Sequence, residues 1–237
     1  MKWMLSGLLL FSILANIGAF WLIKTLYLRE NLAHLDPLSL DVYPESAPAK
    51  IPGQKRVVFF GDSRSLAWTA PDVPGYEFIN RGIGDQTSAQ IRLRYDQHVA
   101  PLQADILILQ LCVNDLKVIP LQPALYQTIV GQCQQNLQAI IDQALAAGSD
   151  VWVTTVFPLG VVPLERRLFW SDEVATAIQE VNQYILSLQQ QGVTVFDSFA
   201  ILQGDHGRIK PEYSRDLLHL NAKGYEALNQ ALSVQWQ

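Results

Sequence analysis

Residues 56–64, RVVFFGDSR, place a short apolar run directly before a polar turn. Runs of β-branched and aromatic residues that end in turn residues are typical of buried strands. A serine in the turn from a strand to a helix exposes its hydroxyl, and its own N–H points into the same space, so Ser63 is a candidate nucleophile. Gly, Asp and Ser are also common turn residues, so this segment alone is equally compatible with an ordinary turn or helix cap.

The rest of the chain repeats this alternation of elements. Four more strands are predicted at residues 77–80, 105–112, 151–156 and 193–196. Helices are predicted between and after them at residues 87–99, 122–147, 172–191 and 221–234. Strands that alternate with helices predict a three-layer α/β/α sandwich, with a parallel sheet covered on both faces. Ligands bind such sheets beyond the carboxyl ends of the strands, so the residues that follow each strand are the candidates for chemistry.

Polar turns follow the second and third strands as well. Residues 80–88, NRGIGDQTS, contain two glycines, which permit backbone conformations that direct N–H groups at a ligand. Asn114 and Asp115 follow the third strand, and the Asn114 amide is suited to donate to a developing oxyanion. Simple turn chemistry explains both segments equally well at this stage.

Near the C-terminus, Asp216 and His219 are separated by a spacing that lets the carboxylate turn back onto the imidazole. Asp216 would then hold the ring in one tautomer and stabilise the imidazolium formed when His219 accepts a proton. A lone histidine is more commonly a surface or core residue. The neighbouring aspartate favours the catalytic interpretation here.

Taken in order, these four segments resemble the four sequence blocks of the SGNH (GDSL-type) hydrolase family, and the resemblance extends from residue 56 to about residue 232. It implies a flavodoxin-like, five-stranded parallel sheet and a serine ester hydrolase that needs no cofactor or metal. By this resemblance Ser63 attacks an ester carbonyl, His219 acts as general base and then general acid, and Asp216 orients His219.

The resemblance also implies an oxyanion hole formed by the nucleophile N–H, a glycine N–H of the second block and the asparagine amide of the third. Ser63 and Asn114 match the first and last of these donors. Counted from Asn80, the family glycine falls on Asp85, one residue past Gly84, so both remain candidates. A carboxylate at residue 85 would oppose the developing negative charge unless its side chain turns away.

Cys112 stands where the family usually has a glycine before the asparagine, and Cys133 is the other cysteine of the chain. They form no CxxC pair and the four histidines are scattered, so no zinc site is predicted. A disulfide between the two cysteines is one alternative, and two buried free thiols are the other. Catalysis by Cys112 is disfavoured because no histidine lies near it in sequence.

The N-terminus is strongly apolar. Residues 3–23 carry no charge, and at a helical rise of about 1.5 Å per residue they span a bilayer core. A cleaved signal peptide is the alternative, but its apolar region would be about 7–15 residues long and would end in a small-x-small site. We therefore expect an uncleaved single-pass anchor. Lys2 and Lys24 lie at opposite ends and give no preference for orientation, and an extracytoplasmic catalytic domain is expected from the usual signal-anchor layout.

The domain organisation follows from these features. Residues 36–55 contain four prolines, which block helices and ladders and favour extended chain. We expect a transmembrane anchor at residues 1–30, a Pro-rich linker at 31–55 and the catalytic domain at 56–237.

Composition excludes some functions and leaves others open. A net charge of −5 and a pI near 5.3 argue against binding of nucleic acid. The expected substrate is a small-molecule, lipid or glycan ester. An O-acetyl esterase or acetyltransferase acting on cell-envelope polysaccharide is an alternative, and a non-catalytic binding module is another. Two alternatives remain for the apolar residues Trp68 and 161–170, which either line the substrate pocket or pack in the core. Two also remain for Arg64, Arg166 and Arg167, which either meet an anionic substrate group or are solvated.

Overall fold

The computed structural model describes residues 2–236. Residues 1 and 237, the outer limits of the expected anchor and catalytic domain, lie outside that range. The contacts divide the chain into two compact units, Met1–Asp41 and Val42–Gln237, which are described separately below.

The first unit is dominated by one long helix, α1 (Lys2–Leu35). Its side chains are exposed, and its length and hydropathy are sufficient to cross a membrane, either as an anchor or as a signal sequence. The helix continues past residue 30, so the first residues of the expected linker are helical. A 3-10 turn, Leu40–Val42, follows it.

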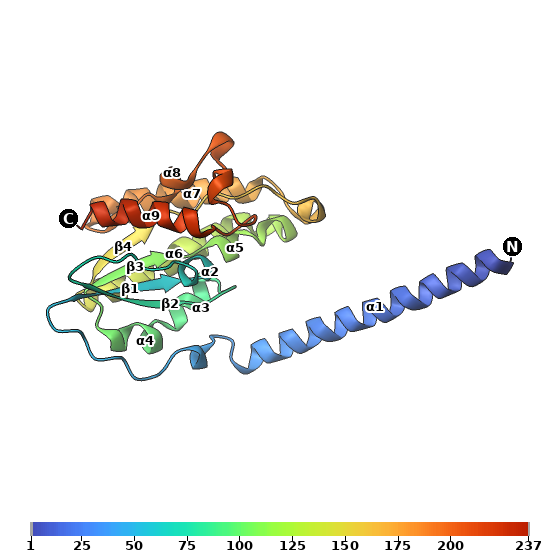
Figure 1. The fold of residues 1–237 in the computed structure, drawn as a ribbon, viewed down its shortest axis with the longest axis horizontal. Coiled ribbons are helices and arrows are strands. Elements are labelled where there is room, and N and C mark those ends of the chain that lie inside the picture. Colours follow the sequence, from blue (N-terminus) through green and yellow to red (C-terminus); the bar gives the residue numbers. More distant parts are fainter. Residues whose placement is uncertain (1, 237) are drawn as a thin grey trace. The chain divides into compact units, whose positions relative to one another are not determined.

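The second unit contains a parallel sheet of five strands in the order β2-β1-β3-β4-β5 (Figure 1). This order confirms the predicted flavodoxin-like fold, in which β2 is added on one side of β1 and the later strands are added on the other. The strands are β1 (Lys55–Gly61), β2 (Tyr76–Gly82), β3 (Ile106–Gln110), β4 (Asp150–Thr154) and β5 (Thr194–Phe196).

Two hydrophobic cores lie on opposite faces of the sheet, because successive side chains of a strand point to opposite sides. In β1, Val57 and Phe59 belong to one core, whereas Val58 and Phe60 belong to the other. All four side chains are fully buried or nearly so. A strand buried on both faces reads as an uninterrupted apolar run, which is why residues 56–61 predict it.

Helices cover both faces of the sheet. The core that contains Val58 is closed by α3 (Ser88–Leu93), α4 (Tyr95–His98), α6 (Tyr126–Ala146) and α7 (Glu173–Ser187). The core that contains Val57 is closed by α8 (Ser198–Leu202) and α9 (Ala222–Val234). The helix predicted over residues 87–99 is divided into α3 and α4 at Arg94.

Two further helices, α2 (Ser63–Leu66) and α5 (Val113–Leu116), start shortly after the ends of β1 and β3. Each is a single turn, which is too short to produce a 3.6-residue hydrophobic period, so the sequence pattern misses them. They nevertheless carry Ser63 and Asn114, two of the predicted site residues.

Residues 43–50 of the proline-rich segment belong to the second unit and are bonded to its sheet. The Tyr43 hydroxyl donates to the Gly82 carbonyl at the end of β2. Further along, Lys50 Nζ lies 3.0 Å from Asp105 Oδ2. The Pro48 carbonyl accepts a hydrogen bond from the Arg56 guanidinium at 3.0 Å. The residues between 43 and 50 are therefore attached to the sheet at several points.

Candidate active site

Ser63 is placed by a tight turn at the carboxyl end of β1. Asp62 caps α2, and its Oδ1 accepts a hydrogen bond from the Arg64 N–H at 2.9 Å. Gly61 is required just before the cap, because a Cβ there would lie 1.8 Å from the Gln110 carbonyl oxygen. The strand, the glycine and the cap together put the serine at the first turn of the helix.

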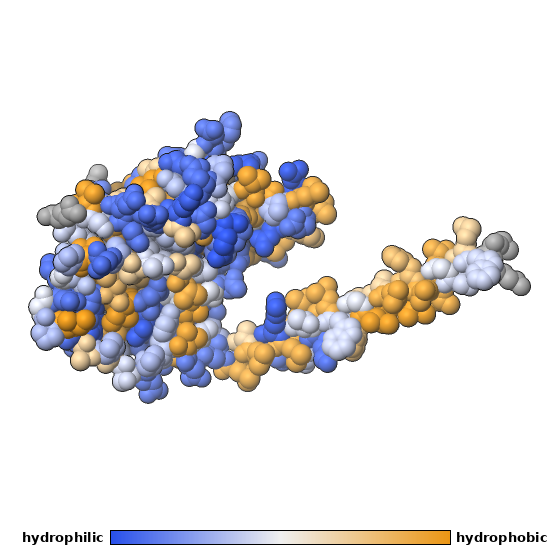
Figure 2. Space-filling model, in the orientation of Figure 1, coloured by the Kyte–Doolittle hydropathy of each residue, from blue (hydrophilic) through white to orange (hydrophobic). Residues whose placement is uncertain are grey.

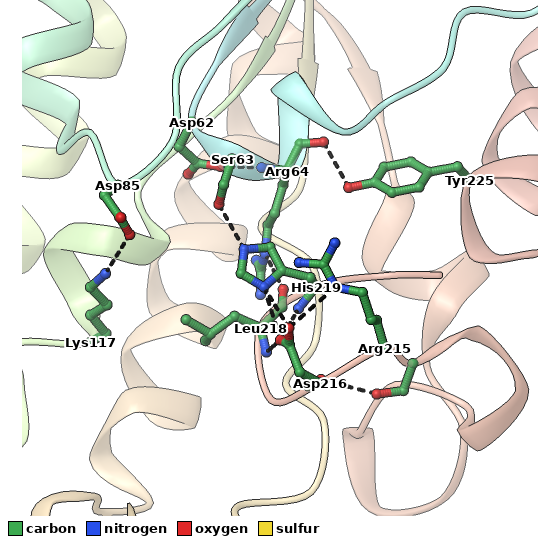
Figure 3. A network of polar contacts seen from close by, with 11 residues as sticks. Asp62, Ser63, Arg64, Asp85, Lys117, Arg215, Asp216, Leu218, His219 and Tyr225 are labelled. Atoms are coloured by element: carbon green, nitrogen blue, oxygen red, sulfur yellow. Dashed lines mark hydrogen bonds and ion pairs between the residues drawn. The ribbon is translucent and has the colours of Figure 1, made fainter. Parts of the chain in front are cut away.

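Ser63, His219 and Asp216 form one continuous chain of contacts (Figure 3). Ser63 Oγ lies 2.9 Å from His219 Nε2, and His219 Nδ1 lies 2.9 Å from Asp216 Oδ1. With the ring proton on Nδ1, directed at the carboxylate, Nε2 can accept the serine proton. The structure therefore brings together the three residues that the sequence predicts as a catalytic triad.

The electrostatics of Asp216 suit this arrangement. Partial burial acts to raise the pKa of its carboxyl, but hydrogen bonds from Leu218 N–H, the His219 ring and His219 N–H outweigh it and lower the pKa to about 2. Asp216 is therefore ionised at neutral pH. An ionised carboxylate both orients the imidazole and stabilises the imidazolium.

Arg64 is fully buried, so both predicted roles, contact with an anionic substrate group and solvation, are wrong. Its Nε donates to the Leu218 carbonyl at 2.7 Å, and another guanidinium nitrogen donates to the Phe157 carbonyl at 3.2 Å. Burial lowers the pKa of this guanidinium to about 10. Because Leu218 directly precedes His219, Arg64 holds the backbone that carries the His219 ring.

Asp62 is also fully buried, directly before the nucleophile. Burial raises the pKa of its carboxyl to about 6, against the opposing effect of the Arg64 charge. Its Oδ2 has no hydrogen-bond partner within residues 2–236. Asp62 and Arg64 are therefore two buried side chains of opposite charge that flank Ser63 in the sequence.

Asn114 lies on the first turn of α5, after β3, and is buried. Its Nδ2 donates to the Gln86 carbonyl at 2.9 Å, which joins the third block to the second. An amide nitrogen carries two hydrogens, so one such bond leaves a second donor for a ligand.

The Asp85 side chain is exposed, contacts Lys117 and lines the same hollow as His219. It is 96% exposed, and its Oδ1 lies 3.6 Å from Lys117 Nζ (Figure 3). The backbone at Asp85 has φ 61°, the left-handed conformation that glycine adopts most easily and that aspartate tolerates. The lysine thus offsets the carboxylate that replaces the expected glycine next to Gly84.

Cys112 also has a left-handed backbone, with φ 87°, which explains why a glycine suits this position. A disulfide joins it to Cys133 on α6, with the two Cα atoms 5.8 Å apart. This result selects the disulfide over two free thiols. The sulfur of Cys112 is thereby bonded, so Cys112 is not a nucleophile in this state.

Two members of this chain of contacts, Asp216 and His219, border an open hollow of about 720 Å³, which Asp85 and Lys117 also line. Asp216 and His219 form one side, and the loop after β4 forms another through Val161, Pro163 and Arg166. Trp68 does not line it. That side chain is buried in the core around Phe59, so of its two predicted roles packing is correct.

Two supporting residues were not predicted from the sequence. Asn80 Nδ2 donates to the carbonyls of Ser65 and Trp68, at 2.8 and 3.2 Å, and so attaches β2 to the turn of the nucleophile. The buried Arg94 donates to the carbonyls of Gly61 and Arg81, at 2.9 and 2.8 Å. Neither has a local sequence signal, because each acts on backbone that is distant along the chain.

A family model matches most of the chain. Residues 59–227 match the model of the GDSL-like lipase/acylhydrolase family. No curated protein matches the sequence. Within residues 2–236, no group of three His, Cys, Asp or Glu side chains is arranged to hold a metal ion.

Several solved structures share the fold. A candidate acylhydrolase of Bacteroides fragilis is 22% identical, with a TM-score of 0.65, over 85% of this chain and 99% of its own. A GDSL-like lipase of Bacteroides thetaiotaomicron is 21% identical, with a TM-score of 0.63, over 83% and 92%. An aryl esterase of M. smegmatis is 19% identical, with a TM-score of 0.56, over 77% and 98%.

Proposed function

Because the chain belongs to the GDSL-like lipase/acylhydrolase family, we propose that it is a hydrolase of carboxylic esters with Ser63 as its nucleophile. The observation that carries the proposal is the continuous contact of Ser63, His219 and Asp216 at the carboxyl end of the sheet. Each member of the chain is within hydrogen-bond distance of the next, as nucleophilic catalysis by a hydroxyl requires.

In the proposed mechanism Ser63 Oγ attacks the ester carbonyl carbon while His219 Nε2 takes the hydroxyl proton. The tetrahedral intermediate collapses, the carbonyl–alkoxy bond breaks, and His219 returns the proton to the leaving alcohol. Water then attacks the acyl-serine ester and gives a proton to His219. The acyl–Oγ bond breaks, His219 returns that proton to Ser63 Oγ, and the acid is released. Asp216 stays ionised throughout and stabilises each imidazolium.

The proposed oxyanion hole consists of the Ser63 N–H, the N–H of Gly84 or Asp85, and the Asn114 amide. Loss of one such donor typically lowers turnover by roughly 10²–10³-fold. The alternative of a non-catalytic binding module rested on the carboxylate of Asp85. The contact of that carboxylate with Lys117 offsets its charge and so supports the catalytic proposal over this alternative.

We further propose that α1 is an uncleaved single-pass anchor and that the catalytic domain is extracytoplasmic. The length and hydropathy of α1 support the anchor. The disulfide between Cys112 and Cys133 supports the location, because disulfides persist mainly in oxidising compartments.

The test is hydrolysis of p-nitrophenyl esters, from acetate to palmitate, by the wild-type protein and by Ser63→Ala. Ser187→Ala, at an exposed serine on α7, is the matched control. We expect turnover by the wild type and the control and almost none by Ser63→Ala. Equal turnover by all three proteins would reject Ser63, and no turnover by a folded wild type on any ester would reject the esterase.

A further inference from the structure

The loop between β4 and α7 exposes a cluster of large apolar side chains. The exposed fractions are 66% for Val161, 76% for Leu164, 87% for Leu168 and 64% for Phe169. Single exposed apolar residues are normal on protein surfaces, but a concentration on one short segment marks an interaction site. Figure 2 shows hydrophobic surface at the tip of this loop, which Figure 1 draws between β4 and α7.

The way in which the loop is attached keeps these apolar side chains exposed. Val162 and Trp170, at its two ends, are partly buried against the core that contains Val58. Between them, residues 164–169 form a 3-10 helix with no buried residue. The ends are therefore held against the protein while the middle projects its apolar side chains into solvent.

The loop is continuous with the active site. Its residues Val161, Pro163 and Arg166 line the same hollow as His219 and Asp216. Anything that covers the apolar side chains therefore lies next to the hollow that His219 and Asp216 border.

Two cations accompany the apolar side chains. Arg166 and Arg167 are exposed, and no hydrogen bond or ion pair to another described residue engages their guanidinium groups. Glu165, on the same turn, offsets one of these charges. Arginines beside exposed Leu and Phe are the combination that binds a membrane surface, because the apolar groups enter the acyl boundary while the guanidinium groups meet headgroup phosphates.

We propose that the loop 161–169 inserts into the surface of a bilayer that contains anionic lipids, and that the substrates are acyl esters resident in that membrane. The substrate part of this inference rests on the proposed ester hydrolase. The occupant is a lipid surface because the cluster combines free cations with apolar side chains, and because the same chain carries a helix that is long enough to cross a membrane.

The docking test uses Val42–Gln237, since α1 by itself would bind lipid. This unit contains the whole sheet, both cores and the triad, and it is separate in its contacts. Its size is that of solved relatives such as the aryl esterase, 98% of which is matched by 77% of this chain. Binding is measured by sedimentation with vesicles of phosphatidylcholine, alone or mixed with phosphatidylglycerol.

We expect the wild type to bind the mixed vesicles. The double variant Leu168→Asp/Phe169→Asp should bind more than tenfold more weakly, because two large apolar side chains lose their burial. Arg167→Gln should reduce the preference for phosphatidylglycerol. Leu186→Asp/Val234→Asp, at exposed apolar positions on α7 and α9, is the matched control and should bind as the wild type does. Failure of the wild type to bind, or equal binding by both double variants, would overturn the proposal.

Activity separates this proposal from the proposed function. Leu168→Asp/Phe169→Asp should hydrolyse a soluble p-nitrophenyl ester at the wild-type rate but hydrolyse lysophospholipid or acylglycerol in vesicles more than tenfold more slowly. Equal rates on vesicle lipid would reject the membrane substrate while leaving the esterase intact. If the wild type did not hydrolyse any soluble ester, the proposed esterase would be rejected. Vesicle binding would then still test whether loop 161–169 inserts into a membrane.

Discussion

Replacing Arg64 by methionine is expected to lower kcat far more than it changes KM. Arg64 is fully buried and its guanidinium donates to backbone carbonyls, so we expect it to act on the position of His219 and not on substrate binding. It acts through the Leu218 and Phe157 carbonyls, at 2.7 and 3.2 Å. Methionine keeps an apolar side chain of similar length but has no hydrogen-bond donor. The Leu218 and Phe157 carbonyls therefore lose the charged donor that they share.

The magnitude follows from these two bonds. A hydrogen bond from a charged donor contributes roughly 1.5–3 kcal/mol, so about 3–6 kcal/mol of contact is removed before the loop relaxes. Relaxation displaces the backbone that carries His219, and a misplacement of about 1 Å in a catalytic group costs on the order of 10²-fold in rate. We therefore expect kcat to fall about 100-fold, and Arg64→Lys to recover part of the loss.

The change also acts on Asp62, whose pKa in the folded protein is about 6 against an ordinary value of 3.8. A pKa raised by folding contributes stability below pH 3.8, and that contribution is lost as pH rises through about 6. A rise of this size corresponds to a few kcal/mol, on the order of 1.4 kcal/mol for each tenfold change in the ionisation constant. The positive charge of Arg64 favours the ionised form of Asp62 and so limits the loss of stability at high pH. Because Arg64→Met removes this charge, the variant should be destabilised most above pH 6.

The assay combines steady-state kinetics on a soluble p-nitrophenyl ester with urea unfolding at pH 5 and pH 8. The double variant Arg64→Met/Asp62→Asn should recover stability at the higher pH, because no buried charge remains, while kcat stays low. Asp62→Asn alone is the control, since asparagine also caps helices. Wild-type kcat in a folded Arg64→Met protein would refute the role of Arg64 in positioning His219.

Three further predictions concern the rest of the site. Asp216→Asn should lower kcat by roughly 10⁴-fold with the fold intact by circular dichroism, because the neutral amide no longer enforces the tautomer; a loss below tenfold would contradict the triad. Asn114→Ala should lower kcat by roughly 10²–10³-fold with KM nearly constant, and an effect on KM alone would argue against oxyanion binding. Cys112→Ala/Cys133→Ala should lose about 3 kcal/mol in urea unfolding, from the 21-residue separation of the cysteines. Cys112→Gly/Cys133→Ala should recover about 1 kcal/mol of this, because glycine accepts φ 87°. Equal stability of the two cysteine variants would show that the backbone at residue 112 is unstrained.

Local sequence determined much of the fold. A strand buried on both faces is an unbroken apolar run, so residues 56–61 and 105–112 predict β1 and β3 directly. The turns that follow them contain Ser63 and Asn114, and the three-residue spacing predicts the contact of Asp216 with His219. These features depend on neighbours along the chain and on the rule that parallel strands end at one edge of a sheet.

Only the tertiary structure decided the roles of residues whose partners are distant along the chain. Arg64 looks like a solvated cation, yet its partner Leu218 lies 154 residues away. Trp68 enters the core, and Asp85 contacts Lys117. Burial of a charge is stable only when acceptors converge on it, and that convergence is a property of the assembled sheet and loops. A sequence pattern records which side chains are polar, whereas packing decides which of them are buried and paired.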